Sequence, residues 1–241
     1  MKNKSISNPI RKKETMTFGE SVVKFYKSLK ITSALPAGVE VMNPIASKET
    51  FAVLKEFYLK YFSDNNQRVF LFGINPGRFG GGITGIPFTD PVTLEKDCGI
   101  INPFNKRGET SAEFIYKMID KWGGAEKFYS SFYITAVSPL GFIKDGKNYN
   151  YYDDNKLLTA VESFIVSTVK AQLKFPCRKD VAICIGTGKN FDYFSGINAV
   201  HNFFDKIIAV PHPRYIMQYE RKKIKSHIGN YVKVLNEALN S

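Results

Sequence analysis

The spacing of hydrophobic positions along the chain changes several times and predicts alternating helices and strands. Apolar side chains fall at helical spacing from Phe18 to Leu29 and again from Phe51 to Phe62. Short, nearly continuous apolar runs, typical of strands buried on both faces, cover Arg68–Gly73, Ser131–Val137, Asp180–Ile185 and Lys206–Val210. Further helices are expected near 111–121, 154–173, 188–196 and 219–239. This alternation predicts an α/β fold with three layers, α/β/α, around a central, mostly parallel four-stranded sheet.

The connections in this pattern indicate where chemistry is to be expected. In an open parallel sheet the ligand crevice lies outside the carboxyl ends of the strands, so the loops after residues 73, 137, 185 and 210 should converge. The segment from Leu35 to Pro44 reads as a Pro-containing connection, and a long Gly-rich loop follows residue 73. Residues 145–154 are expected to form a polar surface loop.

Length and composition favour one packed domain. The 241 residues, 44% of them hydrophobic, are enough for a full core and exclude a disordered chain. Residues 1–15 carry few large apolar side chains and read as a flexible basic tail, which leaves 16–241 as a single domain. The basic residues of that tail are Lys2, Lys4, Arg11, Lys12 and Lys13.

Charge points to a polyanionic partner. The formal net charge is +12 at pH 7, which favours nucleic acid first and an anionic membrane surface second, although many basic proteins bind neither. No run of about 18 apolar residues predicts a membrane span, and no secretory signal is recognised, so we expect an intracellular, cytoplasmic protein. The three cysteines lack metal-site spacing and are expected to be reduced and buried, with no metal bound.

The loop from Gly73 to Phe88 is the richest candidate for chemistry. Its glycines allow close backbone approach to a ligand, and its prolines fix the turns. A phosphate-cradling loop is one interpretation, but the Lys-Ser/Thr ending of a Walker loop is absent here. A separate short segment, Gly186-Thr187-Gly188-Lys189, stands at a strand-to-helix turn and offers an anion site, so a small-nucleotide-binding enzyme stays open as an alternative.

The order of residues within the loop resembles the first motif of the single-strand-selective monofunctional uracil-DNA glycosylases. Asn75-Pro76-Gly77, Phe79-Gly80 and Thr84-Gly85-Ile86-Pro87-Phe88 follow one another in the family's register without a gap. Looser similarity covers most of the chain from about 20 to 238. It includes Val41–Pro44, Ser131–Leu140 and Pro211-His212-Pro213-Arg214. The resemblance implies a DNA-repair glycosylase of the uracil-DNA glycosylase superfamily, a monomer without cofactor whose partner is damaged DNA.

The same resemblance implies roles for three side chains. Asn75 would hold the water that attacks C1′ of an extruded nucleotide, His212 would hydrogen-bond the departing base, and Phe88 would stack on that base. From the residues alone, Asn75 could instead be a turn residue before proline and Phe88 an ordinary core side chain. The histidine motif aligns in two ways, because His212 can take either the family's histidine position or its serine position.

Further site residues follow from these loops. The expected substrate-binding residues are Gly73, Ile74, Pro76, Gly77, Phe79, Thr135 and Ala136. The expected DNA contacts are Arg78, Lys189, Pro213 and Arg214, with plain surface exposure as the alternative for the basic ones.

Ala136 departs from the uracil-selective relatives, which carry an asparagine at this position that pairs with the edge of uracil. Alanine cannot make those hydrogen bonds, so uracil specificity is not carried over. Thr135, Ser138 or residues 145–154 are candidates to supply the missing contacts, and another deaminated or oxidised base is a candidate substrate. This departure also leaves open a non-catalytic nucleic-acid-binding module on a glycosylase fold.

Overall fold

The computed structural model describes residues 15–241, so the basic tail expected at 1–15 lies outside the described part except for Thr15. Two single turns of 3-10 helix, η1 (Pro44–Ala46) and η2 (Arg221–Lys223), accompany the α-helices. The α-helices are α1 (Phe18–Ser28), α2 (Lys48–Tyr61), α3 (Gly81–Thr84), α4 (Pro91–Lys96), α5 (Thr110–Trp122), α6 (Ala125–Ser131), α7 (Asn155–Gln172), α8 (Lys189–His201), α9 (Pro213–Tyr219) and α10 (Ile224–Leu239).

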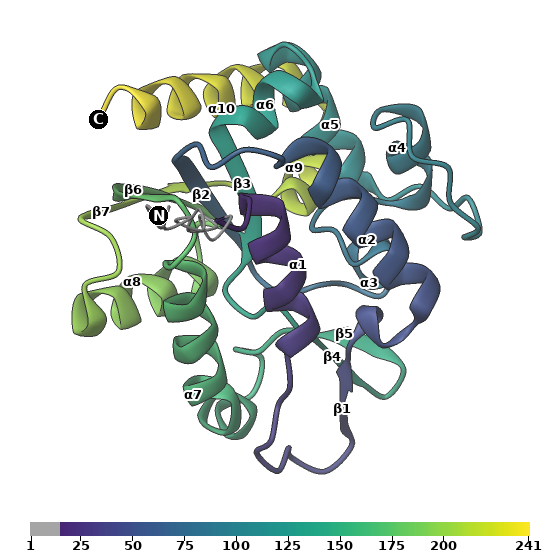
Figure 1. The fold of residues 1–241 in the computed structure, drawn as a ribbon. Coiled ribbons are helices and arrows are strands. Elements are labelled where there is room, and N and C mark those ends of the chain that lie inside the picture. The colour runs from purple at the N-terminus through teal and green to yellow at the C-terminus, as the bar shows by residue number, and fades with distance from the viewer. Residues whose placement is uncertain (1–14) are drawn as a thin grey trace, which may run out of the picture.

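A four-stranded parallel sheet forms the centre of the molecule, with the strand order β3-β2-β6-β7. Every residue of β2 is buried, because helices cover both faces of the sheet. Figure 1 shows α1, α7 and α8 on one side of the strands and α5, α6 and α10 on the other. The predicted three-layer α/β/α architecture is thereby confirmed. The strands are β2 (Arg68–Gly73), β3 (Phe132–Ala136), β6 (Cys177–Ile185) and β7 (Lys206–Val210).

The carboxyl ends of the four strands are aligned at one edge. Gly73, the last residue of β2, pairs with Ala136 at the end of β3, and Ile185 of β6 pairs with Val210 of β7. Hydrogen bonds continue one residue further, since the Val137 amide donates to the Gly73 carbonyl at 2.9 Å. The loops that leave this edge therefore begin side by side, as the sequence predicted.

A second, antiparallel sheet was not predicted. It has the order β1-β4-β5, with β1 (Val39–Met42), β4 (Gly141–Lys144) and β5 (Lys147–Tyr149). The turn between β4 and β5 is Asp145-Gly146, and both residues have positive φ (50° and 68°), as a two-residue hairpin requires. The segment from Leu35 to Pro44, expected as a connection, thus contains strand β1. The segment 145–154, expected as a polar surface loop, contains the turn of the hairpin and its second strand, β5.

Other boundaries also differ from the predicted pattern. The Gly-rich loop after residue 73 contains the short helix α3, and the helix expected at 219–239 begins only at Ile224. The preceding residues form η2, because three consecutive basic side chains offer no apolar face to pack. The cysteines Cys98, Cys177 and Cys184 are buried and free, as expected.

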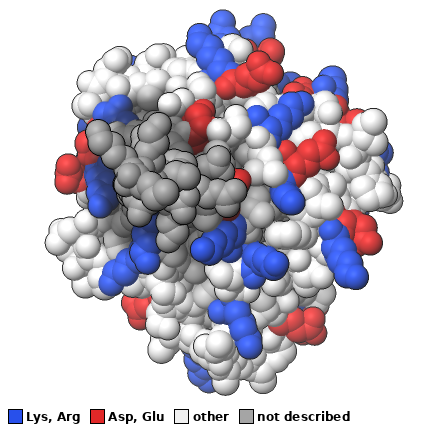
Figure 2. Space-filling model, in the orientation of Figure 1, with Lys and Arg blue, Asp and Glu red and all other residues white. Residues whose placement is uncertain are grey.

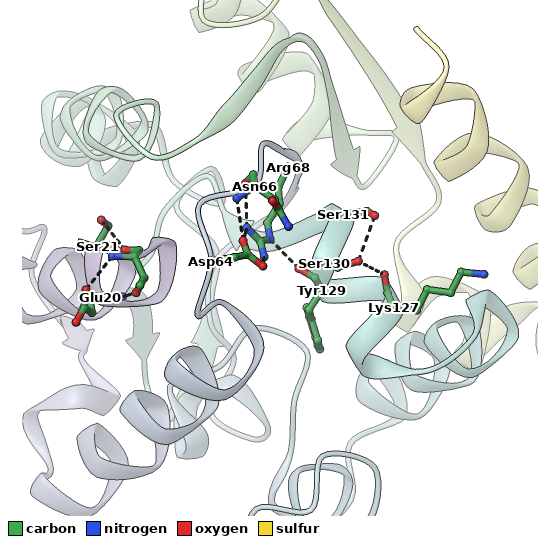
Figure 3. Close-up of polar contacts among 10 residues, drawn as sticks. Glu20, Ser21, Asp64, Asn66, Arg68, Lys127, Tyr129, Ser130 and Ser131 are labelled. Carbon is green, nitrogen blue, oxygen red and sulfur yellow. Dashed lines mark hydrogen bonds and ion pairs between the residues drawn. The ribbon is translucent and has the colours of Figure 1, made fainter. Parts of the chain in front are cut away.

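The amino end of β2 is held by a buried arginine (Figure 3). The Arg68 Nε donates to the Tyr129 carbonyl of α6 at 2.7 Å, and its Nη1 and Nη2 donate to the two carboxylate oxygens of Asp64 at 2.9 and 3.1 Å. The guanidinium also lies over the rings of Phe18 and Phe62. Arg68 therefore joins the start of the central strand to α6 and α1, at the end of the sheet opposite the converging loops.

Charged side chains of both signs lie on one face of the molecule. Figure 2 shows Lys and Arg spread across one face of the molecule with Asp and Glu between them. None of the helices in residues 15–241 has the length and apolar character needed to cross a membrane. The same residues hold no cluster of three or more His, Cys, Asp or Glu side chains suited to a metal ion.

Candidate active site

A cavity opens at the carboxyl edge of the central sheet, where five segments distant in sequence meet. They are the loop after β2, the start of α5, the carboxyl end of β3, the hairpin with the turn that follows it, and the loop between β7 and α9. Ten of the residues predicted from the sequence line the cavity: Gly73, Ile74, Asn75, Pro76, Gly77, Phe88, Thr135, Ala136, His212 and Arg214.

The side-chain amide of Asn75 is held in one orientation by the backbone of the hairpin. Its Nδ2 donates to the carbonyls of Tyr149 and Pro76, both at 3.3 Å, and its Oδ1 accepts from the Tyr151 amide at 3.2 Å. Rotating the amide by 180° would place N–H against N–H and oxygen against oxygen. Because a carbonyl oxygen has two lone pairs, the fixed Oδ1 retains one acceptor position for a further donor.

Tyr151 is itself anchored, which fixes the amide that meets Asn75. Its ring is fully buried, and its hydroxyl donates to the Asn190 Oδ1 of α8 at 2.7 Å. The Asn190 Nδ2 in turn contacts Cys184 of β6 at 3.2 Å. The orientation of Asn75 is therefore set by the central sheet through two intermediate residues.

The ring of Phe88 lies between Gly73 and His212. A Cβ atom at Gly73 would meet the Phe88 Cε2 at only 2.9 Å, so only glycine admits the ring here. The rings of Phe88 and His212 are 5.7 Å apart between centroids. Phe88 also has φ of 52°, a left-handed conformation that is rare for a bulky side chain. An aromatic surface is thus placed inside the cavity at the expense of backbone strain.

His212 begins helix α9 as its N-cap. The ring Nδ1 accepts a hydrogen bond from the Arg214 amide at 3.1 Å. Burial first and the nearby Arg214 charge second lower the pKa of the imidazole to about 4. A neutral ring whose Nδ1 accepts must carry its proton on Nε2, so His212 presents an N–H donor near neutral pH.

Ala136 lies in the cavity wall, and two of its three predicted substitutes, Thr135 and Ser138, do not replace the missing amide. The third, the segment 145–154, contributes Asn148 and Asn150 to the same wall. Thr135 lines the cavity, but its hydroxyl donates at 2.6 Å to the buried Gln172 Oε1 of α7. The buried Ser138 hydroxyl donates to the Leu140 carbonyl at 2.7 Å and is not among the lining residues. Both donors are used within the protein.

Four predicted residues lie outside the cavity wall: Arg78, Phe79, Lys189 and Pro213. The Phe79 ring instead packs under two guanidinium groups, with the Arg107 Cζ at 3.9 Å and the Arg78 Cζ at 5.2 Å from its centroid. Lys189 is exposed at the start of α8. Pro213 is buried as the first residue of α9.

Six further residues line the cavity that were not selected individually from the sequence. Gly81 and Pro87 belong to the motif loop, Asn148 and Asn150 belong to the candidate segment 145–154, and Glu109 and Ser111 belong to no segment that the sequence singled out. Asn148 accepts from the Arg78 amide at 2.8 Å and so ties the hairpin to the loop after β2. The Asp-Gly pair at 145–146 was the one local signal for that hairpin, whereas Glu109 stands in a segment without a recognisable motif.

Comparison with known proteins identifies the family and the fold. Residues 59–236 match the family model of the uracil DNA glycosylase superfamily. The crystal structure of wild-type SMUG2 from Pedobacter heparinus superposes with a TM-score of 0.91 and 42% sequence identity, covering 94% of this chain and 100% of that one. A search among curated proteins gave no match.

Proposed function

The chain belongs to the uracil DNA glycosylase superfamily, and from this premise we propose that it flips a damaged base out of DNA and hydrolyses the N-glycosidic bond of that base. Membership makes it a hydrolase of N-glycosyl bonds that acts on DNA. The proposal adds the residues that carry out the reaction and a monofunctional outcome. None of the described residues that line the cavity is a lysine, which supports hydrolysis without a strand-cleaving step.

The fixed amide of Asn75 is the observation that carries the proposal. Its Oδ1, oriented by Tyr151, accepts a hydrogen bond from a water and holds the water oxygen toward C1′. An amide is a weak base, which suits a dissociative reaction: the C1′–N bond breaks first, and the cationic sugar then captures the water. The water oxygen ends on C1′, and its surplus proton leaves with the base or with solvent.

His212 acts on the departing base. As the glycosidic bond breaks, the bonding electrons move onto the base, and negative charge develops on its carbonyl oxygen. The neutral Nε2–H of His212 donates to that oxygen, and its low pKa keeps the ring neutral under physiological conditions. Phe88, fixed between Gly73 and His212, provides the surface on which the extruded base stacks.

Contacts with the rest of the DNA belong to the proposal as well. Arg214 lines the cavity at the start of α9, and we assign it, with Arg78, Pro213 and Lys189, to contacts with the strand. We further propose that one copy of the protein acts alone, without cofactor, in the cytoplasm.

The test is base release from single- and double-stranded oligonucleotides that contain uracil, hydroxymethyluracil, hypoxanthine or xanthine. The parent protein should generate abasic sites that break only on heating in alkali. Asn75→Ala and His212→Ala should each slow release by about 100-fold or more. The first removes the acceptor that holds the water, and the second removes an oriented donor worth about 2.7–4 kcal/mol. Asn105→Ala, an exposed asparagine outside the cavity, is the matched control and should behave like the parent. No release of any lesion, or full activity in both site variants, would contradict the proposal.

A further inference from the structure

The carboxyl group of Glu109 faces the cavity beside the loop from Gly73 to Phe88. It is the residue immediately before α5, and its side chain lies between the cavity and an outer groove, so that it lines both. A Cβ atom at Gly80 would collide with the Glu109 Oε2, and Gly80 has φ of 67°. The loop therefore carries glycine where it passes the carboxyl group, and this close approach fixes where the carboxyl group lies.

Glu109 and its neighbour Asp90 have opposite environments. The carboxylate of Asp90 is buried and accepts four hydrogen bonds, three of them from Val92 and Thr93 and one from the Glu109 amide at 2.6 Å. The carboxyl group of Glu109 has no hydrogen bond and no ion pair within residues 15–241, although it is largely enclosed.

The surroundings of Glu109 keep its proton bound near neutral pH. Burial first and the nearby Asp90 charge second raise the pKa of its carboxyl group to about 7, against the opposing Arg214 charge on α9. His212 in the same cavity is neutral at this pH, as its own lowered pKa requires. The outer groove adds mixed charges: Lys96, Asp97, Glu113, Lys117 and Asp120. Near neutrality, Glu109 is therefore a carboxylic acid in a substantial fraction of molecules.

We propose that Glu109 is a specificity-determining residue that hydrogen-bonds the edge of the flipped base and supplies the pairing that Ala136 cannot make. The inference rests on the glycosylase function proposed above. A protonated carboxyl group has one donor and one acceptor on neighbouring atoms, like the amide of an asparagine. Deamination leaves a base with a carbonyl group beside a ring N–H, and the carboxylic acid pairs with both. The ionised form has no donor and faces the base carbonyl with negative charge.

The experiment compares Glu109→Gln with Glu109→Ala in single-turnover release of uracil, hypoxanthine and xanthine. The glutamine variant keeps a donor and an acceptor, so its rate should stay within about threefold of the parent at pH 6.5. The alanine variant should lose about 10- to 100-fold, the effect of an unpaired base edge. Glu113→Gln, an acidic residue on α5 that lines only the outer groove, is the control and should match the parent.

The pH profile separates pairing with the base from a merely structural role. The parent value of kcat/KM should fall as pH rises from 6 to 8.5, because Glu109 loses its proton in that interval, and the Glu109→Gln profile should be flat. Melting temperature and affinity for undamaged DNA, measured for each variant, identify loss of folding or of general DNA binding.

Two results would overturn the inference while the proposed function stands. In the first, Glu109→Ala releases every base at the parental rate. In the second, Glu109→Gln is as slow as Glu109→Ala, and the activity of the parent rises with pH. That result would mean that the ionised carboxylate of Glu109 is the active form. Failure of the proposed function differs from both, because the parent itself would then release no base.

Discussion

At the scale of single residues, strain at Phe88 is part of the construction of the cavity. A left-handed backbone costs a bulky residue about 1–3 kcal/mol. It is maintained here by the buried Thr84, whose hydroxyl donates to the Thr89 carbonyl at 2.6 Å and accepts from the Ile86 amide at 3.1 Å. These bonds close the turn on both sides of Phe88. The aromatic ring is thus in place before a base arrives, so its ordering does not reduce the affinity.

Gly73→Ala should remove this arrangement with one methyl group. The new Cβ would stand 2.9 Å from the Phe88 Cε2, and the ring must move out of the cavity. Loss of base stacking, worth about 1–3 kcal/mol, predicts a decrease in kcat/KM of about 5- to 150-fold. Gly73 does not have positive φ, so the variant should fold, and circular dichroism should show the parental spectrum.

Gly196→Ala is the matched control for that variant. A Cβ atom at Gly196 meets no atom within 4 Å, and the residue lies within α8. The substitution should leave kcat/KM unchanged and stabilise the helix by about 0.5–1 kcal/mol. Equal activity of Gly73→Ala and Gly196→Ala would show that the position of the Phe88 ring does not matter for base release.

At the scale of helices and strands, prediction from the sequence succeeded where burial imposes a period. The four central strands were predicted because each contains a short, nearly continuous apolar run, which in β2 is buried on both faces. The hairpin of β4 and β5 was missed because it is short and largely solvated, with the exposed Lys147 in its second strand. The order of residues in the loop around Asn75 was recognised as a motif. Glu109 was not selected as a site residue, because its environment is created by Gly80 and Asp90, which are 29 and 19 residues away in the sequence.

The buried Arg68 gives an element-scale prediction at the opposite end of the sheet. Asp64→Ala removes both carboxylate partners of a guanidinium that is fully buried (Figure 3). The free energy of unfolding should fall on the order of 3 kcal/mol, the lower end for breaking a buried pair, since the Asp64 side chain is 40% exposed. Urea denaturation measures this change.

The control for the Arg68–Asp64 pair is Glu237→Ala, which breaks the exposed ion pair between Glu237 and Lys233 (3.8 Å). This variant should change the free energy of unfolding by less than about 0.5 kcal/mol. Base release by Asp64→Ala at low temperature should equal that of the parent, because Arg68 begins the strand that Gly73 ends. A specific loss of activity with unchanged stability would contradict a purely structural role for the pair.

At the scale of the whole molecule, net charge and the placement of the cavity act together. The net charge of +12 attracts DNA at long range, while acidic side chains are interspersed among the basic ones on the face that Figure 2 shows. Net charge by itself therefore does not fix where DNA lies on the protein. Local cations at the mouth of the cavity must do that, and Arg214 is a cationic residue in the cavity wall.

Affinity for undamaged duplex DNA should therefore decrease with salt, and its dependence should identify Arg214 as a phosphate contact. Each neutralised phosphate contributes about −0.9 to the slope of log K against log salt concentration. Arg214→Gln should reduce the magnitude of that slope by about 1, whereas Lys127→Gln should leave it unchanged. Lys127 is on α6, immediately before β3, and so lies at the end of the sheet opposite the cavity (Figure 3). Fluorescence anisotropy at salt concentrations between about 50 and 200 mM measures both slopes. Equal slopes for the two variants would mean that the guanidinium of Arg214 does not neutralise a phosphate, and its place in the cavity wall would then serve the flipped base alone.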